Sequence, residues 1–316
     1  MQIIELPEIA VLHKKVLRLM GNRFEISVIS EDADFAANCI EAAIKEIQRI
    51  EKLFTTFNEE SDTNRINTCA GVKPVKVAKE VVGLIIRSLR ISEITQGSFD
   101  ITYGSIDKRL WNFDIHMKSL PDPATAKRSV RLINYKNVIV DEKESTVFLK
   151  EKGMRIGFGG IGKGYAAEKA KKLLQEMGIE SGIVNAAGDL TAWGFQPNGL
   201  PWTIGIADPD VKNHVFSSLN ISNMAVATSG NYEKYAVIDG RKYSHTIDPK
   251  TGLPVSGIKS VTIIASSAEL ADALATPVMV MGIGAGLHLI NQLPNTHCVV
   301  IDDNNKLYTS SNIKLS

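Results

Sequence analysis

The stretch between Ser266 and Gly282 constrains the fold most, because it marks both ends of a helix and carries polar groups inside it. Ser266 and Glu269 stand three residues apart, which is the spacing of a capping box at a helix start. Apolar residues then recur every three or four positions up to Met281, so one face is expected to pack on a core. Gly282 is typical of the position just beyond a helix end. This stretch therefore predicts an amphipathic helix with defined ends.

Two polar residues of this helix, Asp272 and Thr276, are four positions apart and project from the same face. Small alanines around Asp272 keep the surroundings open. A carboxylate and a hydroxyl are hard oxygen ligands, and Mg²⁺ takes one or two such groups while water and phosphate oxygens complete its octahedron. The same pair is compatible with an exposed aspartate and a threonine bonded to its own helix, so the spacing leaves both interpretations open. Pro277 predicts a kink or an end of the helix just after Thr276.

The composition is that of an ordinary globular protein. Of the 316 residues, 44% are hydrophobic and 22% are charged, and this length suits one large or two moderate units. The 36 basic and 35 acidic residues leave a net charge of +1, so no global field recruits nucleic acid or an anionic membrane. The three cysteines include no CxxC pair, which argues against a disulfide framework or a zinc site. No apolar run approaches the length of a membrane span.

A second informative stretch runs from Arg155 to Met177 and opens a predicted helix with several glycines. Glycines at a helix N-terminus let backbone amides approach a phosphate, and the helix dipole favours negative charge there. Lys163 adds a mobile cation among them. The stretch lacks the GxxxxGK[ST] pattern of a Walker A loop. A glycine-rich turn that only permits close packing explains the pattern equally well, so both interpretations stay open.

The rest of the chain combines two more predicted helices with a series of short strands. Helical spacing predicts helices over 34–54 and 77–96, whereas 57–67 is polar and is expected to be a loop. The expected strands cover 23–29, two within 133–149, 183–189, 202–207, 218–226, 235–239 and 259–265, with a hairpin over 298–308. His245 lies on a strand beside a tight turn at 248–252. There it is either a base or hydrogen-bond donor or, as is commoner for a lone histidine, a packed side chain.

Eight short motifs follow one another between Met20 and Cys298: MGNRF, GSFD, LWNF, GGIGKGYAAE, NAAGDL, ATSGNY, YSHTIDPKTGLPV and ADALAT. In this order they resemble the ApbE family of FAD:protein FMN transferases. The resemblance implies a single domain over residues 1–316, with an α+β fold of mixed and antiparallel sheets flanked by helices and two lobes around a flavin cleft. It also implies an enzyme that uses Mg²⁺ to split FAD, moves FMN onto a threonine or serine hydroxyl of a partner protein, and releases AMP.

The resemblance assigns the family's functional residues to definite positions of this chain. The implied metal ligands are the backbone carbonyl of Gly160 and the side chains of Asp272 and Thr276. The implied FAD contacts are Met20, Phe57, Ser98, Phe99, Asp100, Lys163 and the backbone of Ile247. Lys163 and Asp272 are expected to act in catalysis at the phosphates, and His245 is the candidate that orients or deprotonates the acceptor hydroxyl.

Two positions depart from the family pattern. Phe57 stands where the family often has tyrosine, so a stack on the flavin survives but a hydroxyl contact does not. Gly157 stands where many members carry an aspartate, which removes any side-chain contact there. Many members are exported lipoproteins, whereas this sequence shows no leader or lipobox cysteine. We therefore expect a cytoplasmic protein, or an exported one if a leader has been removed.

The implied pocket suits more than one activity. Water in place of the acceptor hydroxyl would turn transfer into hydrolysis of FAD to FMN and AMP. A non-catalytic flavin-binding protein is the third possibility, although a binder does not need a carboxylate and a hydroxyl placed at a metal. Docking of the acceptor decides between transfer and hydrolysis, and one chain does not show it.

Overall fold

The computed structural model describes residues 10–107, 110, 119–207, 215–230, 235–238, 240–311 and 313. Parts of two sequence motifs, 111–113 and 231–232, lie outside the described residues. The helices are α1 (Ala33–Phe54), α2 (Asp62–Thr68), α3 (Lys79–Ile94), α4 (Pro123–Ser129), α5 (Gly162–Glu176), α6 (Ala268–Met281) and α7 (Ile283–Ile290). In the described part of the chain, every helix is too short or too polar to cross a bilayer.

The main sheet has eight strands, in the order β1 (Val11–Leu19), β2 (Asn22–Ser30), β6 (Gly182–Ala186), β7 (Asp189–Trp193), β10 (Met224–Gly230), β13 (Ile258–Ala265), β14 (His297–Asp302) and β15 (Leu307–Thr309). A small sheet joins β3 (Val75–Lys76), β5 (Thr146–Leu149) and β4 (Val138–Asp141). Two hairpins pair β8 (Trp202–Ala207) with β9 (Val215–Ile221) and β11 (Tyr235–Ile238) with β12 (Arg241–Ser244). The pairings among the described strands are all antiparallel. The predicted α+β class is therefore confirmed, and of the predicted mixed and antiparallel sheets the structure shows antiparallel ones.

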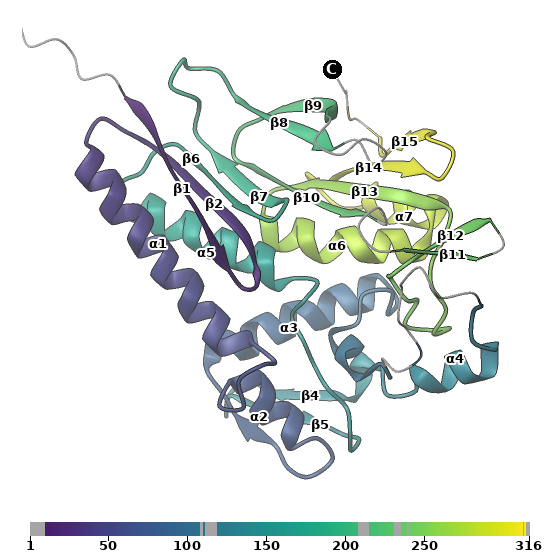
Figure 1. Ribbon diagram of the computed structural model, residues 1–316. Coiled ribbons are helices and arrows are strands. Elements are labelled where there is room, and N and C mark those ends of the chain that lie inside the picture. Colours follow the sequence, from purple (N-terminus) through teal and green to yellow (C-terminus); the bar gives the residue numbers. More distant parts are fainter. Residues whose placement is uncertain are drawn as a thin grey trace, which may run out of the picture.

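Helices α1, α5 and α6 cover one face of the main sheet, and α3 and the small sheet lie beyond them (Figure 1). The inner strand β13 is buried along its whole length, because both faces of the sheet are covered there. On β13, Ile263 belongs to the core that the helices share, whereas Ile264 belongs to a second cluster with Trp202 and Leu219 of the β8–β9 hairpin. Successive side chains of a strand point to opposite faces, so this alternation places the helices and the hairpin on opposite sides.

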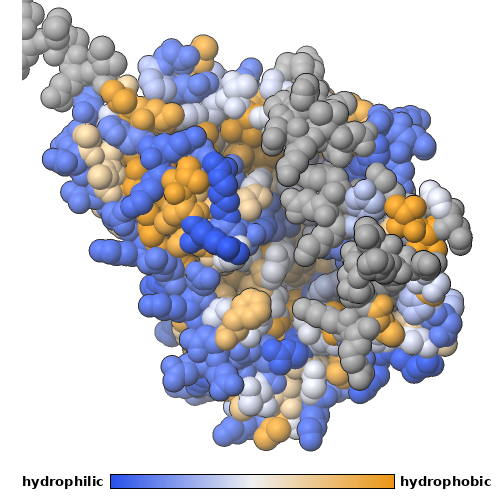
Figure 2. Space-filling model, in the orientation of Figure 1, coloured by the Kyte–Doolittle hydropathy of each residue, from blue (hydrophilic) through white to orange (hydrophobic). Residues whose placement is uncertain are grey.

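Strand β1 forms one edge of the main sheet. Its large apolar side chains Val11, Leu12 and Val16 are exposed, and apolar residues gather over this part of the molecule in Figure 2. Lys14 and Lys15 of the same strand form ion pairs with neighbouring glutamates. Charged side chains thus interrupt an apolar edge, which discourages pairing with the edge of another sheet.

Helix α6 starts differently from the predicted capping box. Ser267, not Ser266, is the N-cap, because its backbone is extended and its Oγ accepts the N–H of Leu270 at 3.3 Å. Glu269 does not complete a box, since its carboxylate accepts hydrogen bonds from the guanidinium of Arg87 on α3. An ion pair between distant segments therefore replaces the local motif.

Helix α6 continues through Pro277 to Met281, so of the two predicted effects of Pro277 the end after Thr276 is wrong and the kink stays a prediction. The predicted stop at Gly282 is confirmed. The predicted open surroundings of Asp272 are wrong as well, because Ala271 and Ala273 are completely buried. The helix is packed on most sides, and this tertiary packing maintains it where the proline removes one backbone hydrogen bond.

Three further segments differ from the sequence prediction. Residues 57–67 include most of α2, whose N-cap Ser61 accepts the N–H of Asn64. The single strand predicted over 218–226 is interrupted at Asn223, whose positive φ of 54° turns the chain from β9 into β10. His245 follows β12 rather than lying within a strand.

Helices α5 and α6 approach each other closely at Gly164. A Cβ added to Gly164 would lie 2.1 Å from the carbonyl oxygen of Ala268 and 2.8 Å from Cβ of Asp272. Gly157 and Gly159, in contrast, have no neighbour within 4 Å of such a Cβ. Close packing therefore accounts for Gly164 but not for Gly157 and Gly159 of the preceding turn.

Replacement of Gly164 by alanine is expected to destabilise the protein by about 1–3 kcal/mol or more, because the blocking atoms belong to the backbone of α6. The matched control is Gly159→Ala, which adds the same methyl group in open space at a residue without a positive φ. Urea unfolding of both variants checks this expectation. Equal stability of the two variants would mean that the two helices are not held this close in solution.

Candidate active site

Asp272 and Thr276 occupy one face of α6, where α6 contacts α5 and strand β10. Asp272 is only 6% exposed. The hydroxyl of Thr276 lies 3.0 Å from Oγ of Ser229 on β10. The exposed aspartate of the alternative interpretation is therefore ruled out, and the threonine hydroxyl bonds to a neighbouring strand. No local sequence pattern points to Ser229, because its pairing with Thr276 depends on β10 lying under α6.

The glycine-rich turn leads directly into α5. The carbonyl of Phe158 accepts the N–H of Gly162 at 2.6 Å, and the helix begins without a side-chain cap. The N–H of Gly164, in the first turn of the helix, donates to Oδ2 of Asp272 at 2.9 Å. Amides of a first helical turn have no partner inside the helix, and they attract anions together with the helix dipole. The start of α5 and the carboxylate of α6 thus form one site.

Lys163 lies between two buried carboxylates. Its ammonium group forms an ion pair with Oδ2 of Asp189, at the start of β7, and lies 3.6 Å from Oδ1 of Asp272. Asp189 is not among the residues assigned from the family resemblance, although the NAAGDL motif contains it. In the sequence Asp189 is a single carboxylate after a glycine, and this pattern does not predict any specific chemistry.

The charges in this cluster depend on one another. Burial raises the pKa of Asp189, repulsion from Asp272 raises it further, and the ammonium of Lys163 opposes both effects. Burial also raises the pKa of Asp272. For Lys163, burial lowers the pKa, but the two carboxylates outweigh burial and hold that pKa above its usual value. The ammonium group therefore stays charged and stabilises both carboxylates.

The side chains of Asp272 and Thr276 offer the hard oxygen donors that a divalent cation such as Mg²⁺ prefers. The described residues contain no group of three or more His, Cys, Asp or Glu side chains that could hold a metal ion. A single carboxylate with neutral oxygens is nevertheless the kind of set that Mg²⁺ uses when phosphate and water supply its other ligands. The ammonium of Lys163, beside Asp272, already occupies the position of a counter-cation. The carboxylate of Asp272, the hydroxyl of Thr276 and the carbonyl of Gly160 are the groups that would hold the ion.

Two of the predicted flavin contacts approach the glycine-rich turn. The Phe99 ring lies 3.5 Å from the position a Cβ would take on Gly160. The terminal methyl of Met20 lies 3.8 Å from the corresponding position on Gly162. Met20 is in the turn between β1 and β2, where it adopts a positive φ of 50°. A ring and a thioether therefore border the proposed phosphate-binding turn.

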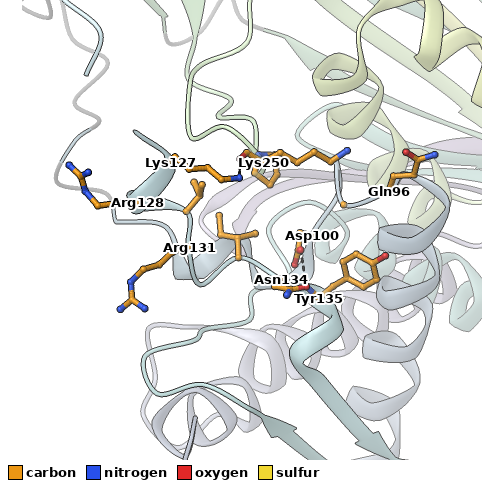
Figure 3. A pocket seen from close by; sticks show the side chains of 12 residues that line it. Gln96, Asp100, Lys127, Arg128, Arg131, Asn134, Tyr135 and Lys250 are labelled. Carbon is orange, nitrogen blue, oxygen red and sulfur yellow. Dashed lines mark hydrogen bonds between the residues drawn. The ribbon is translucent and has the colours of Figure 1, made fainter. Parts of the chain in front are cut away.

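Asp100 has a structural role of its own. Its Oδ1 accepts the N–H and the hydroxyl of Thr102, and its Oδ2 accepts the N–H of Tyr135 at 2.9 Å. An ionised carboxylate offers about four acceptor positions, so a contact with FAD would use the remaining one. Asp100 also lines a cavity of about 540 Å³, and Figure 3 shows Lys127 and Lys250 across this cavity from it.

The remaining predicted residues have contacts other than those described around Asp272 and Lys163. Ser98 precedes Phe99 and is buried, and the N–H of Ile247 donates to the hydroxyl of Tyr103 at 3.2 Å. Phe57 is 98% exposed, at the edge of a second cavity of about 990 Å³ that Arg155 also lines. His245 is exposed directly after β12. The roles assigned to these residues stay predictions.

Comparison with known proteins identifies the family of this chain. The sequence model of the ApbE family matches residues 20–300. A Klebsiella pneumoniae protein named FAD:protein FMN transferase is 30% identical over 295 residues, which cover 93% of this chain and 90% of the relative. The Escherichia coli K12 protein of the same name is 30% identical over 281 residues, which cover 87% of this chain and 79% of the relative.

Solved structures extend the likeness to the fold. The crystal structure of the ApbE protein from Thermotoga maritima superimposes with a TM-score of 0.84 at 31% identity, over 95% of this chain and 97% of that chain. The flavin transferase ApbE from Vibrio cholerae gives a TM-score of 0.82 at 26% identity, over 96% and 98% of the two chains. The family match over most of the sequence and the shared fold together show that this chain belongs to the ApbE family.

Proposed function

We propose that this protein is a Mg²⁺-dependent FAD:protein FMN transferase, which moves FMN from FAD onto a threonine or serine hydroxyl of a partner protein and releases AMP. The names of the relatives support the choice of FAD and of a protein acceptor. The observation that carries the proposal is the contact between α5 and α6. There the carboxylate of Asp272 meets an amide of the first turn of α5 and the ammonium of Lys163.

The proposed reaction exchanges one bond at phosphorus for another. The acceptor oxygen forms a bond to the phosphorus of the FMN half of FAD, and the bond from that phosphorus to the oxygen of AMP breaks. Negative charge builds up on the phosphate oxygens and on the departing AMP. Groups that meet this charge in a buried site, already oriented, lower the barrier most.

The residues divide this work. A bound Mg²⁺ would supply neutralising positive charge at the diphosphate. Asp272, Thr276 and the carbonyl of Gly160 would hold it. Lys163 and the amides at the start of α5 would bind the phosphate oxygens. His245 would accept the proton of the acceptor hydroxyl, so that the attacking oxygen is not positively charged after the bond forms.

Asp272→Asn is expected to lower the rate of FMN transfer on the order of 10²–10³-fold, because it removes the ligand charge in a site that acts electrostatically. Asparagine keeps an oxygen that can accept the N–H of Gly164, so the fold should survive. The measurement incubates the protein with FAD, Mg²⁺ and an acceptor protein carrying a flavinylation site, and weighs the acceptor by mass spectrometry.

The control for this experiment is Asp302→Asn, because Asp302 is also a buried aspartate but caps the turn between β14 and β15. An acceptor that gains the mass of FMN supports transfer. Free FMN and AMP with an unmodified acceptor would instead identify a hydrolase, and intact FAD would identify a binding protein. Full activity of Asp272→Asn would end the metal assignment.

His245→Ala is expected to slow transfer by about 10²–10⁴-fold while leaving FAD affinity nearly unchanged, since the residue acts on the acceptor and not on FAD. Single-turnover transfer and quenching of flavin fluorescence measure the two effects separately. His245→Gln is the matched control, because it keeps hydrogen-bonding groups and cannot take the proton. Loss of FAD binding with unchanged turnover of the bound substrate would exclude the base role.

A further inference from the structure

The proposed mechanism gives no role to the buried carboxylate of Asp189. This carboxylate nevertheless forms an ion pair with Lys163, which the mechanism uses. Asp189 is 4% exposed and forms an ion pair with Lys163, whose ammonium also lies 3.6 Å from Asp272. Two carboxylates thus share one ammonium group. A divalent cation that binds Asp272 must do so beside this ammonium, and like charges a few ångströms apart repel strongly in a buried site.

The backbone of Asp189 is positioned by the main sheet, because Asp189 begins the inner strand β7. In the sheet, Asp189 pairs with Ala186 of β6, and β7 pairs with β10 on its other side. The preceding turn is tied by the N–H of Gly188, which donates to Oδ1 of Asn185 at 2.8 Å. The next residue, Leu190, packs in the cluster under the β8–β9 hairpin, so Asp189 points to the opposite face, toward the helices.

A charge count shows what this carboxylate does for the site. When both carboxylates are ionised and the ammonium is charged, the cluster carries one net negative charge. Without Asp189, the ammonium would neutralise Asp272 by itself, and no net charge would remain to attract a divalent cation. With Asp189, the ammonium has a second partner and Asp272 is free to bind the ion.

We propose that Asp189 is a positioning residue that draws Lys163 away from Asp272 and so sets the affinity of the site for a divalent cation. This inference rests on the proposed function, because it assumes that Asp272 is a metal ligand. It adds a residue outside the ligand set and outside the FAD contacts. The same ion pair keeps the ammonium beside the start of α5, where it would bind the diphosphate.

Binding of Mn²⁺ to the full chain tests this charge count. Electron paramagnetic resonance measures free Mn²⁺ during titration, with and without ADP, a diphosphate that lacks the flavin. Asp189→Asn is expected to weaken Mn²⁺ binding on the order of tenfold, and Lys163→Gln to strengthen it by a similar factor. The double variant has the net charge of the native cluster, so its affinity should return to within about threefold of the native value.

The double variant separates a charge effect from a merely structural one, because structural damage from two substitutions would accumulate rather than cancel. Asp302→Asn is the matched control and should bind Mn²⁺ as the native protein does. Native-like affinity in Asp189→Asn, or a double variant that binds more weakly than Asp189→Asn, would overturn the inference. Circular dichroism first checks that each variant is folded.

If Asp189→Asn does not fold, Lys163→Gln alone decides, because unchanged affinity would show that the ammonium does not compete with the ion. The failure of the proposed function is distinguishable from these outcomes. If the native protein does not bind Mn²⁺, or if Asp272→Asn binds it equally well, Asp272 is not a ligand. That result overturns the metal site and the inference with it.

Discussion

The hydrogen bond from the N–H of Gly164 to the carboxylate of Asp272 is the contact on which the site depends. It joins the start of α5, which attracts anions, to the carboxylate on α6, which attracts cations. It forms only because Gly164 has no Cβ, since a side chain there would collide with the backbone of Ala268. Both the packing of α5 on α6 and the hydrogen bond to Asp272 therefore require glycine at position 164. The small, buried alanines of α6 also allow the two helices to lie close together.

Features set by local sequence could be predicted. The stop of α6 at Gly282 follows from the conformational freedom of glycine, and the long helix α1 follows from its apolar spacing. Asp272 and Thr276 share a face because helical spacing requires it. Only the family resemblance predicts that Lys163 and Asp272 act at the same site. The two residues are 109 positions apart in the chain, so local sequence patterns do not relate them.

Features set by long-range pairing could not be predicted. Ser229 and Asp189 enter the site because β10 and β7 are neighbours beneath α6, and that order of strands is a property of the whole sheet. The N-cap of α6 is Ser267 rather than Ser266, and Glu269 pairs with Arg87 of α3 instead of completing a capping box. Pro277 remains within the helix because the surrounding core maintains it. In each case tertiary contacts decided between local alternatives.

The central claim is that α5 and α6 together form a site for a divalent cation and a diphosphate. Anomalous diffraction from crystals of the full chain with Mn²⁺ and ADP tests it most directly. The account predicts one Mn²⁺ peak within coordination distance of the Asp272 carboxylate, the Thr276 hydroxyl and the Gly160 carbonyl, with the diphosphate against the start of α5. A peak elsewhere, or none at Asp272 while ADP is bound, would contradict it.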